Sequence, residues 1–179
     1  MIPQQNLGGQ GRERTCEPWG VVYPSPESLY RAHRDHLVRT LTVIAGDEEM
    51  ARESVQDAFV QLCLKWSKVA TYDHQVAWLR RVSLNRLRNR RRSLARRAAA
   101  LLRLHGESTR TVSGPEAVRL DLAAGLRRLP ERQRVAIVLH YVGDLTVDEV
   151  ALAMGASPGT VKRHLHRGRE ALRLHLEVK

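Results

Sequence analysis

The sequence predicts an all-α protein with two small helical domains joined by a flexible linker, the C-terminal domain carrying a helix-turn-helix. Apolar residues recur at helical spacing along most of the chain. Residues that favour helix ends, mainly Ser, Asp, Pro and Gly, stand at the borders of these segments. No segment has the alternation typical of a strand. We expect a tail at 1–24, a first domain at 25–103, a linker at 104–115 and a second domain at 116–179.

The composition indicates a polyanionic partner. The 179 residues carry a net charge of +11, with 26 Arg and 4 Lys among them. Such a charge favours binding to nucleic acid. No apolar run is long enough to span a membrane and no signal peptide is evident, so we expect a cytoplasmic protein. Cys16 and Cys63 form neither a disulfide framework nor a zinc pair, and we expect no metal or cofactor.

The first domain begins with two amphipathic helices. The tail is rich in Gly, Gln and Pro and is expected to be disordered. Ser25 and Pro26 start a helix that ends at Gly46, and Asp47 caps the next. The early outer face of this second helix is acidic. Acidic residues near a helix N-terminus are favourable in themselves, but an acidic patch on a basic chain also suits a basic protein partner, and both interpretations stay open.

A loop at 65–75 precedes a third helix, expected from about Val76 to Arg92. Its predicted buried side holds Leu79 and Leu87, and Arg86 and Arg90 also fall there, which requires a carboxylate partner or extended side chains. Between 74 and 110 there are eleven Arg and one acid. A solvated helix can carry such a run, but its length favours phosphate contacts.

The second domain is predicted to hold four helices. Pro115 opens the first, whose inward residues include Leu122 and Leu126, and Pro130 separates it from a helix over 131–141. Thr146 and Glu149 then form a capping box, and the short helix that follows stops at Gly155.

Ser157 caps the last helix, with Pro158 in its first turn. Val161, Leu165 and Leu172 define one buried stripe. The opposite face is basic, as expected for the second helix of a DNA-binding helix-turn-helix. Residues near its N-terminal half are expected to contact bases and later arginines to contact phosphates. The predicted DNA-binding residues are Gly159, Thr160, Lys162, Arg163, His166, Arg167, Arg169 and Arg173.

This segment has two other interpretations. A plain helix pair with a solvated basic face would show a similar pattern. Residues 155–159 also match the G-x-S-x-G motif of hydrolases, but that motif needs a strand before the serine, whereas a helix is expected here. We identify no catalytic residue.

These segments together resemble the extracytoplasmic-function class of bacterial RNA polymerase sigma factors. The resemblance covers about Glu27 to Leu174. Residues 51–66 resemble the family's second conserved region, residues 78–92 its promoter-recognition helix, and the segment with Leu-Pro-Glu-Arg-Gln-Arg at 129–134 its fourth region. Their order and spacing make the match specific.

The resemblance implies a sigma factor that binds core RNA polymerase and directs it to promoter DNA. It implies polymerase contacts by Glu53, Gln56, Asp57 and Phe59. It assigns minus-10 recognition to the loop 65–75 and to Trp78, Arg81, Asn85, Arg88, Asn89 and Arg92. The helix-turn-helix would bind the minus-35 element. An anti-sigma protein is a further candidate partner, which the sequence neither names nor excludes.

Three residues depart from the family pattern. Arg80 stands where an aromatic residue is common, Gly168 replaces a small alanine, and His164 replaces a basic residue. Two other function classes stay open: a helix-turn-helix regulator that works without polymerase, and an enzyme acting on nucleic acid. The regulator would not explain the acidic helix, and the enzyme lacks a metal or nucleophile constellation.

Overall fold

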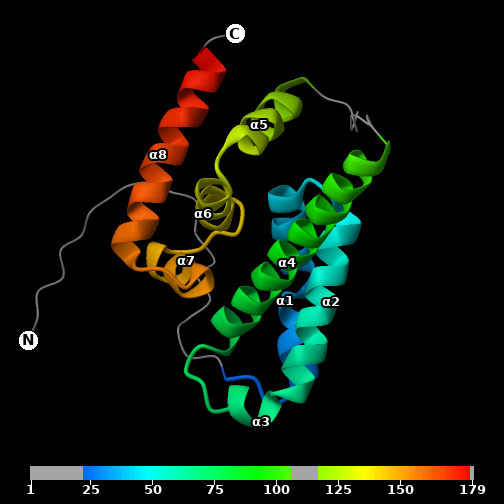
Figure 1. Ribbon diagram of the computed structural model, residues 1–179. Coiled ribbons are helices and arrows are strands. Elements are labelled where there is room, and N and C mark those ends of the chain that lie inside the picture. Colours follow the sequence, from blue (N-terminus) through cyan, green and yellow to red (C-terminus); the bar gives the residue numbers. More distant parts are fainter. Residues whose placement is uncertain (1–21, 106–116, 178–179) are drawn as a thin grey trace, which may run out of the picture.

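The computed structural model describes residues 22–105 and 117–177, and within these ranges the fold is all-α, as predicted. Figure 1 shows the helices in order along the chain. They are α1 (Pro26–Ala45), α2 (Glu48–Leu64), α3 (Trp66–Val69), α4 (Gln75–His105), α5 (Ala117–Arg128), α6 (Glu131–Tyr141), α7 (Val147–Met154) and α8 (Pro158–Glu177). The predicted tail 1–24 and linker 104–115 lie almost wholly outside the described residues.

We call α1–α4 the N-terminal unit. Ser25 caps α1 by accepting the backbone N–H of Ser28 at 3.2 Å, and Gly46 ends the helix with a φ of +73°. The Asp47 carboxylate accepts the Met50 N–H at 2.9 Å and starts α2. These predicted helix ends are confirmed. The unit's core includes Leu29, Leu41, Val55, Leu62, Leu79, Leu84 and Leu87, which are all almost fully buried.

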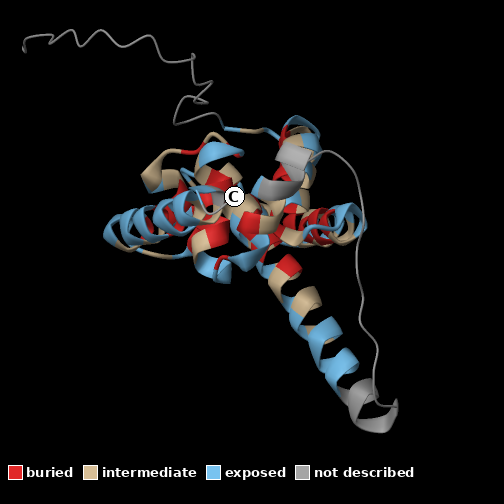
Figure 2. Cartoon of the chain, turned by 90° about the horizontal axis from the view of Figure 1, so that it is seen from above, coloured by how far each residue is buried: buried red, intermediate tan, exposed pale blue. Residues whose placement is uncertain are grey.

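Helix α4 is longer than the sequence analysis predicted. The helix was expected to end near Arg92, but it continues to His105. Residues 93–105 contain mostly Ala, Leu and Arg, which are strong helix formers, and no Gly or Pro interrupts them. Positions 94–99 are exposed, and Figure 2 shows this end of α4 projecting from the body of the molecule. The extension therefore depends on local propensity rather than on core packing.

We call α5–α8 the C-terminal unit. Val135, Val138, Val150 and Val161 form its fully buried centre. The predicted inward position of Leu122 is wrong, since 48% of this residue is exposed. Helix α5 meets α8 one turn later, around Gly125, where an added Cβ would lie 2.9 Å from the ring of His175.

Gly168 lets α8 approach α6 closely. A Cβ at this position would lie 2.8 Å from Cγ1 of Ile137, closer than carbon atoms pack. Glycine in a helix interior costs about 1 kcal/mol relative to alanine. The close approach explains why this chain has glycine at a position where alanine would favour the helix.

The two units lie against each other, with α4 as the shared element. Helices α1 and α2 pack on one side of α4, and α7 packs on another, as Figure 1 shows. Helix α6 also contacts α1, and in the turn after α6 the carbonyl oxygen of Gly143 lies 3.2 Å from His36 Nε2. Among the described helices, none combines the length and apolar character needed to cross a bilayer.

Candidate nucleic-acid and polymerase interfaces

The helix-turn-helix forms as predicted from α7 and α8. Thr146 Oγ1 accepts the Glu149 N–H at 3.3 Å, and Glu149 Oε2 accepts the Thr146 N–H at 2.9 Å, which completes the capping box. Gly155 ends α7 with a φ of +62°, a conformation that favours glycine. Ser157 Oγ then accepts the Thr160 N–H at 3.2 Å at the start of α8. These two tight ends fix the angle at which α8 leaves the turn.

The outer face of α8 presents the predicted DNA-binding residues. Val161 and Leu165 are buried on the inner side, and the predicted residues are exposed apart from Thr160, which is half-buried. Arg163 Nη2 lies 3.3 Å from Thr160 Oγ1. Arg173 pairs with Glu170 and Glu177 at 2.8 Å. Arg163, near the N-terminal end, therefore has a neutral neighbour, whereas Arg173 already contacts two carboxylates of its own helix.

His164 lies on the flank of this face. Partial burial, followed by the positive charges of Arg132, Arg163 and Arg167, lowers its pKa. The ring is therefore predominantly uncharged at neutral pH. The departure from a basic residue at this position removes a positive charge from the flank.

The predicted minus-10 residues do not share one environment. Trp78 and Arg81 line a hollow of about 310 Å³ together with Leu152 of α7 and four residues of the loop before α4, Thr71, Tyr72, Asp73 and His74. Asn89 and Arg92 line a separate hollow further along α4, and Asn85 is exposed between the two. The exposed side of α4 thus brings Trp78, Arg81, Asn85, Asn89 and Arg92 into one row.

Arg88 faces the C-terminal unit instead. Its Nε atom lies 3.3 Å from a carboxylate oxygen of Glu131 on α6, and only 18% of the Arg88 side chain is exposed. Arg81, although exposed, lies over the turn of the helix-turn-helix, where a Cβ on Gly155 would be 2.9 Å from its Nη2 atom. The C-terminal unit therefore borders the minus-10 face that the resemblance implies.

Arg80 and Glu149 form a contact between the units that the sequence analysis missed. Arg80 Nη1 lies 3.5 Å from Glu149 Oε1, and the two side chains are 11% and 15% exposed. The capping box already gives Glu149 a role in the sequence, so nothing there indicates a second partner for its other carboxylate oxygen. The residue that departs from the family's aromatic pattern thus joins α4 to α7.

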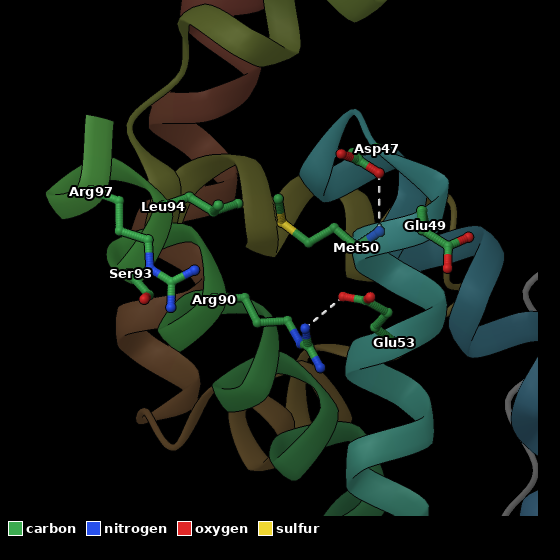
Figure 3. A pocket seen from close by; sticks show the side chains of 8 residues that line it. All are labelled: Asp47, Glu49, Met50, Glu53, Arg90, Ser93, Leu94 and Arg97. Carbon is green, nitrogen blue, oxygen red and sulfur yellow. Dashed lines mark hydrogen bonds and ion pairs between the residues drawn. The ribbon is translucent and has the colours of Figure 1, made fainter. Parts of the chain in front are cut away.

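The acidic face of α2 is paired with α4. Figure 3 shows Arg90 reaching from α4 toward Glu53, whose carboxylate lies 2.5 Å from Arg90 Nη1. Arg90 Nη2 lies 2.8 Å from Asp57. This explains how Arg90 can sit on the inner side of α4. The two carboxylates are nearly half exposed, so they remain accessible on their outer side.

The other two predicted polymerase contacts differ in exposure. Gln56 is exposed on α2. Phe59 is half-buried and stacks on Tyr30 of α1, with ring centroids 4.1 Å apart. Phe59 thus lies on the side of α2 that faces α1, whereas Glu53 and Asp57 lie on the side that faces α4. Within the described ranges, no three His, Cys, Asp or Glu side chains are grouped as metal ligands would be.

The chain is similar in sequence to known sigma factors. Residues 119–172 match the family Sigma-70, region 4, which covers α7, most of α8 and the helices before them. The RNA polymerase sigma-E factor of Streptomyces avermitilis is 30% identical over 151 residues, which is 84% of either chain. The ECF RNA polymerase sigma factor SigE of Mycolicibacterium smegmatis is 30% identical over 165 residues, 87% of this chain and 63% of that longer relative.

Two solved structures share the fold. One is the sigma factor RpoE of Bartonella quintana in complex with the anti-sigma factor NepR, with a TM-score of 0.65, 22% identity, and coverage of 86% of this chain and 97% of that one. The other is CnrH in complex with the cytosolic domain of CnrY, with a TM-score of 0.62, 23% identity, and coverage of 86% and 88%. At these identities the likeness concerns the fold alone.

Proposed function

The chain belongs to the ECF family of RNA polymerase sigma factors, and we propose that it directs core RNA polymerase to promoters through two separate DNA contacts. The observation that carries this proposal is the combination, on one chain, of a basic helix-turn-helix with a helical unit that presents an acidic face and an arginine-rich helix. A sigma factor is a transcription initiation factor. We infer that this chain contributes no catalysis of its own, which the polymerase supplies, and that it acts in the cytoplasm.

The minus-35 contact is assigned to α8. The exposed N-terminal part of α8, with Lys162, Arg163 and His166, would enter the major groove. Arg167, Arg169 and Arg173 follow on the same helix and would contact phosphates, which position the protein without specifying sequence. This division rests on the order of the residues along a helix whose inner side is fixed by Val161 and Leu165.

The minus-10 contact is assigned to α4 and the loop before it. The hollow beside Trp78 and Arg81 is open to solvent and lined by the aromatic rings of Tyr72 and Trp78 and by polar groups. Such a surface suits an unpaired base, whose faces stack on aromatic side chains and whose edges form hydrogen bonds. Asn85, Asn89 and Arg92 extend the same side of the helix toward the next nucleotides, while Arg88 would first have to leave Glu131.

Polymerase docking is assigned to α2. Glu53, Gln56, Asp57 and Phe59 offer two carboxylates, an amide and an apolar ring on one helix. Because Arg90 already neutralises part of the acidic charge, a basic partner helix would share these carboxylates with Arg90 or replace it. RpoE is solved in complex with the anti-sigma factor NepR, and CnrH in complex with the cytosolic domain of CnrY. We propose that this chain also takes an anti-sigma protein as a partner.

Two domains, 25–103 and 116–179, with a linker at 104–115, remain our proposed division. The contacts between the units consist in part of ion pairs, such as Arg80 with Glu149, that a polymerase surface could exchange for its own. Separation of the units would free the side of α4 that faces α7.

Transcription in a purified system tests the proposal. Core RNA polymerase and genomic promoter fragments should give specific run-off transcripts only when this chain is added, and their start sites should share minus-35 and minus-10 elements. Specific binding of duplex DNA by the chain alone, without stimulation of core polymerase, would indicate a polymerase-independent regulator instead.

A further inference from the structure

The segment before α1 is attached to the loop before α4, although the two are far apart in sequence. The backbone N–H of Tyr23 donates to Oε1 of Gln75 at 2.9 Å. The same side chain donates through Nε2 to the carbonyl oxygen of Ala70 at 3.3 Å. Gln75 is only 2% exposed, so its amide is used at both ends in a site shielded from water. Loss of the Gln75 amide would lower the stability of this site, because the Tyr23 N–H and the Ala70 carbonyl would lose their hydrogen bonds.

Tyr23 is itself held by His33 on α1. The Tyr23 hydroxyl lies 2.9 Å from Nε2 of His33, and the two rings meet edge to face with centroids 5.4 Å apart. Burial, followed by the positive charges of Arg80 and His36, lowers the pKa of His33 to about 4. The imidazole is therefore neutral at physiological pH, and a neutral ring has one nitrogen that can accept the hydroxyl proton. We call Tyr23, His33 and Gln75 the clasp.

The clasp holds both ends of the loop at 70–74. Gln75 is the first residue of α4, and Ala70 directly follows α3. One amide side chain therefore joins the residue at which the loop begins to the residue at which α4 begins. The four residues between them line the hollow that also contains Trp78 and Arg81. Since the loop is short, the distance between its ends restricts the positions that its side chains can take.

We propose that Gln75, supported by Tyr23 and His33, is a positioning residue that sets minus-10 base preference through the shape of the loop at 70–74. The inference rests on the proposed function, because it presumes that this hollow receives a minus-10 base. Gln75 lies beneath the loop and need not touch DNA. A loosened clasp would leave the fold intact, change which bases the hollow accepts, and leave the helix-turn-helix unaffected.

Two variants test the clasp. Gln75→Met keeps the length of the side chain and removes both hydrogen bonds, while Tyr23→Phe removes only the hydroxyl that meets His33. Gln133→Met makes the same chemical change at a half-buried glutamine of α6, and Tyr30→Phe removes a tyrosine hydroxyl from α1; these are the matched controls. Each protein is assayed with core polymerase on two promoter libraries, one randomised at the minus-10 element and one at the minus-35 element.

Gln75→Met should lower the preference for the best base at one minus-10 position roughly two- to tenfold. This factor corresponds to the loss of one hydrogen bond between the hollow and the base. Tyr23→Phe should shift the same position by a smaller factor, and the minus-35 preferences should stay as in the wild type. Unchanged minus-10 preferences in both variants, or an equal loss on both libraries, would overturn the clasp as a positioning device. Absence of any minus-10 preference in the wild-type protein would instead overturn the proposed function, and the clasp with it.

Discussion

Three arginines of α4 and two of α8 use their charges in different ways. On α4, Arg80 pairs with α7, Arg88 with α6 and Arg90 with α2, so each of these cations joins two helices. On α8, Arg173 pairs with Glu170 and Glu177 of the same helix, and Arg163 contacts Thr160 one turn earlier. The density of positive charge along a sequence therefore says little about the role of each cation. An arginine that pairs with a carboxylate of another helix holds the two helices together, whereas an arginine whose contacts stay within its own helix remains available to DNA.

A charge reversal on α2 should have the largest effect. Asp57→Arg places a second guanidinium beside Arg90 and removes a carboxylate from the proposed docking surface. Like charges across an interface cost several kcal/mol, so affinity for core polymerase should fall roughly a hundredfold. Helical content by circular dichroism should be retained.

Asp35→Arg is the matched control for this reversal. Asp35 is an exposed acid on α1 that also pairs with a neighbouring arginine, Arg34, at 2.7 Å. Its reversal should leave polymerase affinity close to that of the wild type. Equal affinities for Asp57→Arg and wild type would contradict the docking assignment.

Truncation of arginines on α8 should separate base contacts from phosphate contacts. Arg163→Ala should cost roughly 1–3 kcal/mol and relax preference at one minus-35 position, whereas Arg173→Ala should weaken all promoters alike and lower the salt slope by about one. Transcription from a minus-35 library at several salt concentrations measures both. If both variants lose activity uniformly with unchanged base preference, Arg163 is not a base contact.

Truncation of an arginine on α4 should instead weaken the association between the N-terminal and C-terminal units. We expect protease cleavage within 104–115 to yield two folded helical fragments that remain associated, because the contacts of α4 with α7 do not depend on that segment. Arg80→Ala should weaken the association by roughly tenfold, since Glu149 would keep a poorly hydrated oxygen without its cation. Gel filtration of the cleaved protein measures this, with Arg173→Ala as the control. Fragments that separate at once in the wild type would show that the units do not hold each other.

These contrasts also show what the sequence could predict. Helix ends follow from local chemistry, so the capping box at Thr146 and the left-handed Gly155 were both expected and both form. The extension of α4 beyond Arg92 was missed, because a helix without a buried face has no periodic signal. The pair of Arg80 and Glu149 joins residues of two predicted domains, and periodicity within one helix carries no information about such a partner.

The exposed rows of candidate residues on α8 follow the prediction closely, since an inner stripe fixes the outer face of a helix. On α4 the resemblance grouped Arg88 with Asn85 as minus-10 residues, whereas Arg88 contacts α6. The difference arises because α8 has one packed side, while α4 is packed on more than one. Hydrophobic periodicity identifies a buried stripe, but it does not indicate how many other helices pack against that helix.

Gly168→Ala should test the close approach of α8 to α6. Alanine gains about 1 kcal/mol of helix propensity. It also forces the Ile137 side chain to move, and crowding in a packed interior typically costs about 1–3 kcal/mol. We expect a net loss of stability of about 1 kcal/mol by chemical denaturation, with Gly159→Ala, where no atom lies near the added Cβ, as the control. A more stable Gly168→Ala protein would show that the contact is loose.

The smallest effect concerns His164, on the flank of the α8 face. Its pKa is lowered, first by burial and then by Arg132, Arg163 and Arg167, so at any pH between 7.5 and 6.5 it carries less charge than an ordinary histidine. Over that range, His164 should therefore change the promoter affinity of the wild-type holoenzyme less than a histidine of ordinary pKa would. His164→Lys adds one permanent charge beside the existing arginines and, if it reaches a phosphate, should steepen the dependence of log affinity on log salt by about 0.9. The wild-type and His164→Gln proteins should show the same salt slope at pH 7.5, because neither carries a charge there. A shallower slope for His164→Gln would show that His164 is protonated in the complex.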